Sequence, residues 1–176
     1  MLEDFASDTR HPGGNMDDDF DASADFRYAM ILTWNPDEFD WGDDFRKTVE
    51  ESADNDEIEL SWSTGNRNSG VSDGDRVFLL RQGTQGRGIV ASGYTRGQIE
   101  TDRNWREGSK GTANFVLVAL DRVISVEDAL STDVLNQEIP EGNWDRRQAS
   151  GTFIRGKVVG RLEALWRRHL GELAER

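Results

Sequence analysis

The chain has 176 residues, of which 35% are hydrophobic and 31% are charged, and its formal net charge is −13. This length is enough for one domain with its own hydrophobic core. The absence of cysteine excludes disulfides and thiolate metal sites. No apolar run approaches the roughly 20 residues of a membrane-spanning helix, and the N-terminus has no basic, apolar signal segment. We therefore expect a cytoplasmic protein without a membrane partner.

The charge is unevenly distributed along the chain. Residues 1–25 hold eight acidic residues and one basic residue, and residues 37–59 hold eleven acidic and two basic residues. The acidic, aperiodic segment 1–25 is expected to be a mobile tail, followed by one domain over 26–176. Residues 60–176 hold fifteen acidic and seventeen basic residues, so this part can still form a basic face.

Arginine outnumbers lysine eighteen to three. The planar guanidinium group makes bidentate contacts to phosphate, which favours a nucleic-acid partner. An arginine-biased proteome would explain the same ratio, so composition alone leaves both interpretations open.

The first elements of the domain are a strand and a helix. The apolar run over residues 28–34 predicts a buried strand. Asn35, Pro36 and Glu38 then match a helix N-terminus, with a capping residue, a first-turn proline and a capping-box glutamate. We expect this helix to continue to about Ser52 and to direct four apolar side chains inward: Phe39, Trp41, Phe45 and Val49.

The rest of the chain predicts mainly strands. Residues 61–70, which are rich in Gly, Asn and Ser, are typical of a loop. Strands are expected over residues 58–62, 76–82, 88–95 and 114–124, with the second and third forming a β-hairpin. From Lys157 onward the apolar residues recur at helical spacing. The pattern predicts an α+β domain, with a small, curved β-barrel of about five to six strands flanked by helices.

The sequence offers little for catalysis or metal binding. Its two histidines are His11, in the acidic tail, and His169, which we place on the polar face of the last helix. Without Cys or paired His, a transition-metal site is not expected. Residues 151–158 fit the spacing GxxxxGK, but Val158 stands where a P-loop has Ser or Thr, and Phe153 is typical of a strand. We therefore expect a binding domain without a cofactor, not an enzyme.

Six tryptophans raise the question of which are buried. Trp34, Trp41 and Trp166 are predicted to be core residues, and Trp144 is left open. Trp62 and Trp105 stand in polar surroundings, and Tyr94 closes a strand at a similar boundary. Aromatic side chains placed among arginines at loop mouths can stack on a nucleic-acid base. The alternative for Trp62 is that it plugs one end of the barrel.

Three stretches carry a resemblance to a known family: "YAMILTWNPDEF", "ELSWSTGNRNSGVSDGDRVFLLRQGTQGRGIVASGYT" and "NWDRRQASGTFI…LEALWRRHL". Together they resemble an EVE domain of the PUA-like superfamily, over about residues 27–170. They are most similar to the EVE-like N-terminal domains of McrB-type and EVE–HNH modification-dependent restriction proteins. The order Trp-Ser-Thr at residues 62–64 also resembles YTH domains, which read methylated adenine with an aromatic cage.

The resemblance implies that a modified base is flipped into a pocket beside a PUA-like barrel. Trp62 would form one wall, and Tyr94 or Trp105 the opposite wall. The implied pocket residues are Trp34, Asn35, Trp62, Ser63, Thr64, Asn66, Tyr94 and Trp105. The implied DNA contacts are Arg67, Arg81, Gln82, Arg87, Arg96 and Arg103. Gln148 and Ser150, in the segment "QASG", match the family without an assigned role.

The expected function is the recognition module of a modification-dependent restriction system. It would bind duplex DNA that contains a modified cytosine, with 5-methylcytosine as the first candidate. Cleavage would belong to a GTPase motor or nuclease domain of the parent protein, and the isolated domain would be a monomer. One alternative is a reader of modified RNA or a stand-alone EVE protein that binds a modified nucleotide. Another is an acidic scaffold that recruits a basic protein.

Overall fold

The computed structural model describes residues 28–54, 57–104 and 108–176. The expected tail over residues 1–25 and the side chain of Trp105 lie outside these ranges. The strands are β1 Tyr28–Trp34, β2 Ile58–Gly65, β3 Arg76–Arg81, β4 Gly88–Arg103, β5 Thr112–Val123, β6 Leu130–Ser131 and β7 Thr152–Arg155. The helices are α1 Gly42–Asp54, α2 Thr132–Glu138 and α3 Lys157–Ala174, with 3₁₀ turns at Pro140–Gly142 and Trp144–Arg146.

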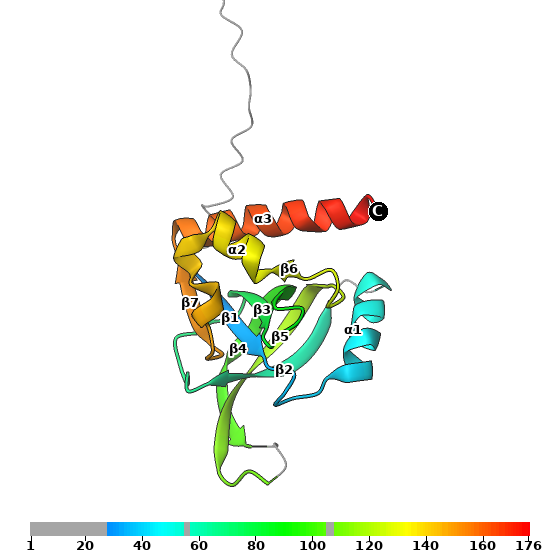
Figure 1. Ribbon diagram of the computed structural model, residues 1–176. Helices are drawn as coiled ribbons and strands as arrows, with labels where there is room; N and C mark the ends of the chain where they lie inside the picture. Colours follow the sequence, from blue (N-terminus) through cyan, green and yellow to red (C-terminus); the bar gives the residue numbers. More distant parts are fainter. Residues whose placement is uncertain (1–27, 55–56, 105–107) are drawn as a thin grey trace, which may run out of the picture.

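The fold is a mixed α+β arrangement around one open sheet (Figure 1). The strand order is β2-β5-β4-β3-β1-β7, and the short β6 pairs with β4. β1 and β3 are parallel, and the other pairs are antiparallel. The α+β class is confirmed. The sheet has seven strands where about five to six were expected, because the short β6 and β7 complete it.

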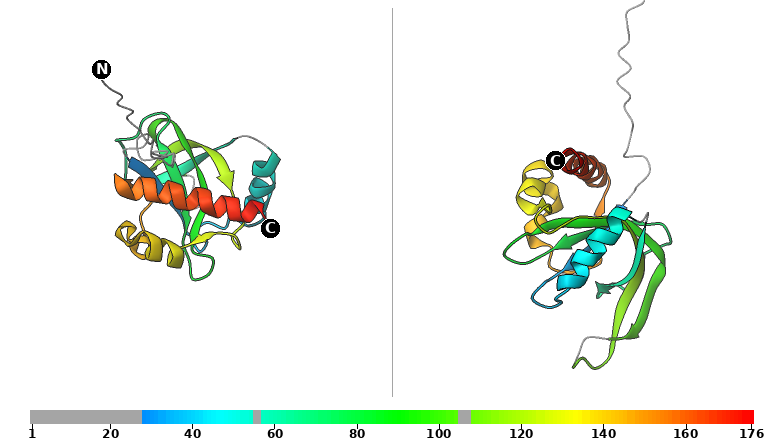
Figure 2. Two further views of the ribbon diagram at one scale, coloured as in Figure 1. Left: turned by 90° about the horizontal axis from the view of Figure 1, so that it is seen from above. Right: turned by 90° about the vertical axis from the view of Figure 1, so that its right-hand side faces the viewer.

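The two faces of the sheet carry different helices (Figure 2). Side chains alternate along β1, so Ala29 and Ile31 pack toward α2 and α3, whereas Met30 and Trp34 pack toward α1. The first face buries Trp144 and Trp166, and the second buries Trp34 and Phe45. The predicted core positions of Trp34 and Trp166 are thus confirmed.

The strand over residues 88–95 is longer than its sequence predicts. β4 continues to Arg103. Its C-terminal end pairs with the N-terminal end of β5, and these two paired ends extend away from the rest of the sheet (Figure 1). Register shifts between Ser92 and Gly93, and between Arg96 and Glu100, mark bulges that bend the pair. The extension was missed because a projecting two-stranded ribbon buries little and so needs no apolar alternation.

The predicted helix start at Asn35 is wrong. Asn35 caps a turn instead: its Oδ1 accepts from the Asp37 N–H (3.1 Å), and its carbonyl accepts from the N–H groups of Glu38 and Phe39. An asparagine side chain favours this local turn as readily as a helix cap. α1 begins seven residues later at Gly42. Of the four residues expected to point inward, Phe45 is buried, and Phe39, Trp41 and Val49 are half-buried against the same cluster, although Phe39 and Trp41 precede α1.

The predicted loop over residues 61–70 is partly wrong as well. Ser61 to Gly65 belong to β2, where Trp62 pairs with Val116 and Ser63 with Phe115. The ladder with β5 overrides the turn preference of Ser and Gly, because pairing satisfies the backbone groups. Trp62 therefore stands on a strand and not at the mouth of a loop.

The last part of the chain agrees with most expectations. Residues 152–155, which lie inside the GxxxxGK stretch, form β7 against β1, so this stretch is not a phosphate loop. α3 covers the predicted helical stretch. His169 is half-buried and not on the polar face: its Nε2 lies 2.6 Å from the Asp128 carbonyl, and its ring stacks on Trp166. Among the described helices, none is long and apolar enough to cross a membrane.

Candidate functional site

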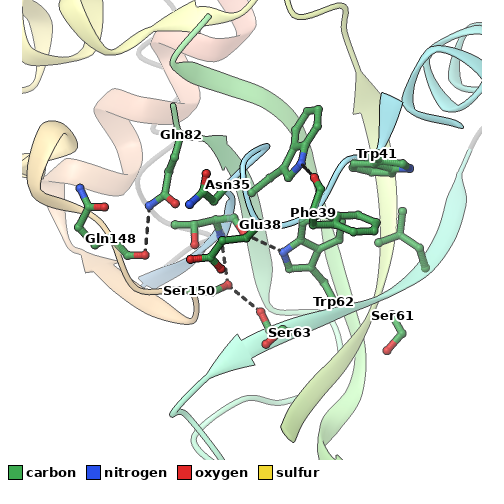
Figure 3. A pocket seen from close by; sticks show the side chains of 13 residues that line it. Asn35, Glu38, Phe39, Trp41, Ser61, Trp62, Ser63, Gln82, Gln148 and Ser150 are labelled. Carbon is green, nitrogen blue, oxygen red and sulfur yellow. Dashed lines mark hydrogen bonds between the residues drawn. The ribbon is translucent and has the colours of Figure 1, made fainter. Parts of the chain in front are cut away.

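A pocket of about 470 Å³ opens on the α1 face, between the turn after β1, the strand β2 and the end of β3 (Figure 3). This volume lies within the range of small-ligand sites. Its lining residues are Thr33, Trp34, Asn35, Glu38, Phe39, Trp41, Leu60, Ser61, Trp62, Ser63, Gln82, Gln148 and Ser150. One side of the pocket is aromatic, and the other is built from amides and hydroxyls.

Three rings form what we call the aromatic corner: Phe39, Trp41 and Trp62. The Trp41 and Trp62 rings lie 5.1 Å apart at 44°, and Phe39 meets Trp62 edge-on at 6.1 Å and 75°. Trp34 lies beneath them, 5.4 Å from Trp41 and only 5% exposed. All three rings line the pocket, so they offer apolar surface to a flat or methylated ligand.

Hydrogen bonds hold two of the indoles in place. Trp62 Nε1 donates to the carbonyl of Thr33 (3.1 Å), and Trp34 Nε1 donates to the carbonyl of Phe39 (2.8 Å). The second bond ties the floor of the pocket to the turn that carries the Phe39 ring. The corner is therefore positioned before any ligand arrives, which lowers the entropic cost of binding.

The polar side centres on Gln82, which is 6% exposed. Its Nε2 donates to the carbonyls of Arg147 (2.6 Å) and Gln148 (3.1 Å), which uses both amide protons. Its Oε1 is the atom left to accept from a ligand donor. Asn35 and Gln148 supply two further amides, and Glu38 supplies the one formal charge among the lining side chains.

A short strap, residues 148–151, joins the two strand edges at the pocket. The Ser150 hydroxyl accepts from the Thr33 N–H (3.1 Å) and donates to the Ser63 carbonyl (2.7 Å), as Figure 3 shows. Gly151 N–H donates to the Ile31 carbonyl (3.0 Å). A Cβ on Gly151 would lie 2.4 Å from the Thr64 carbonyl oxygen, so only glycine permits this approach.

The structure brings together part of the predicted pocket. Trp34, Asn35, Trp62 and Ser63 all line it, and Gln82, expected to contact DNA, lies inside it. Two other predicted residues do not line it. Thr64 is fully buried, with its hydroxyl donating to the Arg67 carbonyl (2.7 Å), and Asn66 is exposed beyond β2. A register shift between Ser63 and Gly65 interrupts the regular pairing of β2 with β5 at Thr64.

Tyr94 does not form the second wall. Its backbone pairs with Arg76 on β3, and the Arg76 guanidinium lies 4.8 Å from the Tyr94 ring centre. That guanidinium binds Glu163 of α3, which places Tyr94 on the α2–α3 side. The wall next to Trp62 comes from Phe39 and Trp41 instead. The other candidate, Trp105, lies outside the described residues.

The predicted DNA-contacting arginines have several different environments. Arg96 binds Glu57 (2.6 Å), and this hydrogen bond raises the pKa of Arg96. Arg103 is exposed near the far end of β4, beyond the pocket lining. Arg81 lies over the Trp34 ring at 5.2 Å and donates to the Gln85 carbonyl. Arg67 and Arg87 donate to backbone carbonyls near the strap.

Sequence reasoning missed several lining residues. Phe39 and Trp41 were assigned to a buried helix face, and Glu38 to a cap. Gln148 and Ser150 were noticed without a role. The signal that was present is the stretch "WNPDEFDW", in which aromatic and acidic residues alternate around a turn-forming Asn-Pro. The described residues include no cluster of three or more acidic or histidine side chains suited to a metal ion.

No family model matches the sequence, and no curated protein matches it. Solved structures do resemble the fold. A hypothetical protein from Leishmania major has a TM-score of 0.54 at 15% identity, covering 88% of this chain and 99% of its own. Proteins from Pseudomonas syringae and Pseudomonas putida give TM-scores of 0.53 and 0.50 at 12% and 14% identity, each covering 81% of this chain and 98% of its own. At these identities the likeness concerns the fold alone.

Proposed function

We propose that the pocket binds a modified nucleobase turned out of a nucleic-acid strand, with 5-methylcytosine in duplex DNA as the first ligand to test. In this proposal the domain is the recognition module of a modification-dependent restriction system. The observation that carries it is the aromatic corner of Phe39, Trp41 and Trp62, which faces amide side chains across a pocket of about 470 Å³.

The energetics of base flipping fit such a site. Turning a base out of a duplex costs a few kcal/mol, and stacking on an aromatic side chain contributes about 1–3 kcal/mol per base. An added methyl group packed in the corner contributes about 0.8 kcal/mol through apolar burial. The Gln82 oxygen and the Asn35 amide are suited to hydrogen bonds with a base edge.

The resemblance to EVE domains supports the same assignment. We further propose that the sheet corresponds to a PUA-like barrel, in which the strap closes the gap between β1 and β2. Ser150 makes this closure by bonding to both strands. Cleavage would then be the task of a motor or nuclease domain of the parent protein.

The test is a fluorescence-anisotropy titration at about 50 mM salt, because salt sets the electrostatic background of binding. Matched duplexes carry cytosine, 5-methylcytosine or 6-methyladenine at one position, and matched RNAs form a parallel series. We expect at least tenfold tighter binding to one modified duplex, about 1.4 kcal/mol. Equal affinity for all the oligonucleotides would overturn the proposal, and preference for a modified RNA would replace DNA with RNA.

Variants connect that preference to the pocket. Trp62→Ala removes one ring of the aromatic corner and is expected to abolish the discrimination between modified and unmodified duplexes. Leu117→Ala is the control, because Leu117 is an exposed apolar residue of β5 outside the pocket. A Trp62→Ala protein that folds and still discriminates would show that the modified base binds elsewhere.

One observation favours a second candidate. Glu38 places a carboxylate in the lining beside three aromatic rings, and such cages also suit methylated ammonium groups. Competition for the pocket between the modified duplex and a trimethyl-lysine peptide shows which of the two ligands binds more tightly. Displacement of the peptide by free lysine would exclude this candidate, since free lysine lacks the methyl groups.

A further inference from the structure

The arginines of the described chain fall into two groups. One group forms ion pairs with carboxylates: Arg46, Arg76, Arg96, Arg161, Arg168 and Arg176. The second group includes Arg67, Arg87 and Arg147. None of these three forms an ion pair with a described carboxylate, although the chain as a whole is strongly acidic.

These three side chains, which we call the guanidinium row, follow one segment of the backbone. Arg87 donates to the Asp145 carbonyl (2.7 Å). Arg147 Nε donates to the Gly142 carbonyl (2.8 Å), and its Nη1 to the Thr152 hydroxyl (2.8 Å). Arg67 donates to the Gly151 carbonyl. The row therefore runs along residues 142–152.

The same segment lines the pocket. Gln148 donates to the Asp145 carbonyl that Arg87 also contacts, and Ser150 precedes the glycine that accepts from Arg67. Residues 37–40 carry three carboxylates and no basic residue, and of these three only Glu38 lines the pocket. A polyanion near the pocket is thus attracted to the row and repelled by the carboxylates of residues 37–40.

One member of the row, Arg147, is partly buried and has no ion pair with a described carboxylate. Burial lowers the pKa of Arg147, and no described carboxylate offsets this cost, whereas Glu163 and Asp121 counter the burial of Arg76 and its pKa is raised. The Nε of Arg87 is buried without a hydrogen-bond partner in the described structure. A guanidinium held by carbonyls keeps further N–H groups for a phosphate oxygen.

We infer that the guanidinium row binds the phosphodiester backbone of the strand whose base enters the pocket. The identity of that base rests on the proposed function, but the position of the backbone rests on the row. The strand lies over residues 142–152 and avoids the acidic turn. None of the three arginines is among the residues that line the pocket, so the row holds the backbone beside the pocket and not inside it.

The test measures how affinity for an unmodified oligonucleotide duplex depends on salt, between about 50 and 250 mM. Each lost phosphate contact reduces the log–log slope by about 0.9 for duplex DNA. Arg67→Gln and Arg87→Gln are each expected to reduce the slope by about that amount. Arg161→Gln is the matched control: it removes the same charge, but Arg161 binds Glu141 (2.9 Å).

Arg147→Lys guards against a folding artefact, because it keeps the charge at the most buried position of the row. We expect it to preserve most of the slope while weakening affinity several-fold, since lysine lacks the bidentate geometry. Thermal unfolding of every variant checks that the fold is retained.

The outcomes separate the row from the pocket. If the salt slope is unchanged in Arg67→Gln and Arg87→Gln, the row does not bind the backbone. The same conclusion follows if Arg161→Gln reduces the slope equally. Either result would stand even if Trp62→Ala abolished the discrimination between modified and unmodified duplexes. Reduced slopes without any preference for a modified base would support the row and overturn only the proposed function. Competition by deoxycytidine monophosphate as strong as that by the duplex would assign the row to a free nucleotide and overturn the backbone assignment.

Discussion

The indole nitrogen of Trp62 donates a hydrogen bond to the carbonyl oxygen of Thr33 at 3.1 Å, across the edge of β1 that β7 leaves open. β7 pairs with β1 only as far as Ile31, so the peptide groups of Thr33 have no strand partner on that side. The Trp62 indole donates to the Thr33 carbonyl, and the Ser150 hydroxyl accepts from the Thr33 N–H. One side chain thus satisfies an edge carbonyl and forms a wall of the pocket.

Replacing Trp62 with phenylalanine keeps an aromatic ring but removes this bond. We expect Trp62→Phe to lower the free energy of unfolding by about 0.5–1.5 kcal/mol and to weaken ligand binding, because the ring is no longer anchored. Trp41→Phe is the control, since the Trp41 indole nitrogen has no hydrogen bond to a described residue. Urea denaturation compares the two, and an equal loss in both would show that the Thr33 bond contributes nothing.

Substitutions at Gly151 and Gly97 distinguish the cost of backbone strain from the cost of a steric clash with a neighbouring strand. Both have positive φ, +76° and +85°, but a Cβ would meet the Thr64 carbonyl at 2.4 Å in Gly151 and nothing within 4 Å in Gly97. Gly97→Ala should therefore cost about 1 kcal/mol of stability from strain alone. Gly151→Ala should cost more and should weaken pocket binding by moving the strap. Equal unfolding midpoints would contradict the strap's tight contact with β2.

Arg76 and Glu163 link the sheet to α3 through a buried pair, with Nε and Oε1 2.6 Å apart. We expect Glu163→Gln to destabilise the domain by about 3–5 kcal/mol, because it leaves a buried guanidinium short of one carboxylate. Glu141→Gln breaks an exposed pair with Arg161 and should change stability far less. Chemical denaturation of both variants measures the difference, and comparable losses would mean that burial does not matter here.

Tyr28 makes stability sensitive to alkaline pH. Its hydroxyl donates to Asp75 (2.7 Å), and this bond, with burial and the Asp75 charge, raises the pKa of Tyr28 above its usual 10.0. The folded state holds the proton more tightly than the unfolded state, so the contribution is complete below pH 10 and is lost as pH rises through the folded pKa.

Tyr28→Phe removes that dependence. The difference in urea midpoint between the natural protein and Tyr28→Phe should be constant up to about pH 9 and should shrink toward pH 11. Subtracting the variant cancels the contributions that the two proteins share. A difference that grows with pH would show that the bond favours the deprotonated form.

Much of the architecture follows from local sequence. The apolar run at residues 28–34 and the helical spacing after Lys157 predict β1 and α3 because burial imposes periods of two and 3.6 residues. The hairpin of β3 and β4 follows from two strand-forming runs joined by a Gly-rich turn. Where the predicted boundaries failed, at Asn35 and Ser61, a turn-forming residue had two local options, and tertiary contacts selected one.

The sequence by itself also singled out Trp62 as an aromatic residue in polar surroundings, and it indicated a binding domain. Only the tertiary structure decided which residues share the pocket with Trp62. Phe39 and Trp41 join it because the turn after β1 folds over β2, whereas Tyr94 lies on the other face because strand side chains alternate. Glu38 lines the same pocket as Gln148 and Ser150 for a similar reason, because residues far apart in sequence come together only when their strands form one sheet.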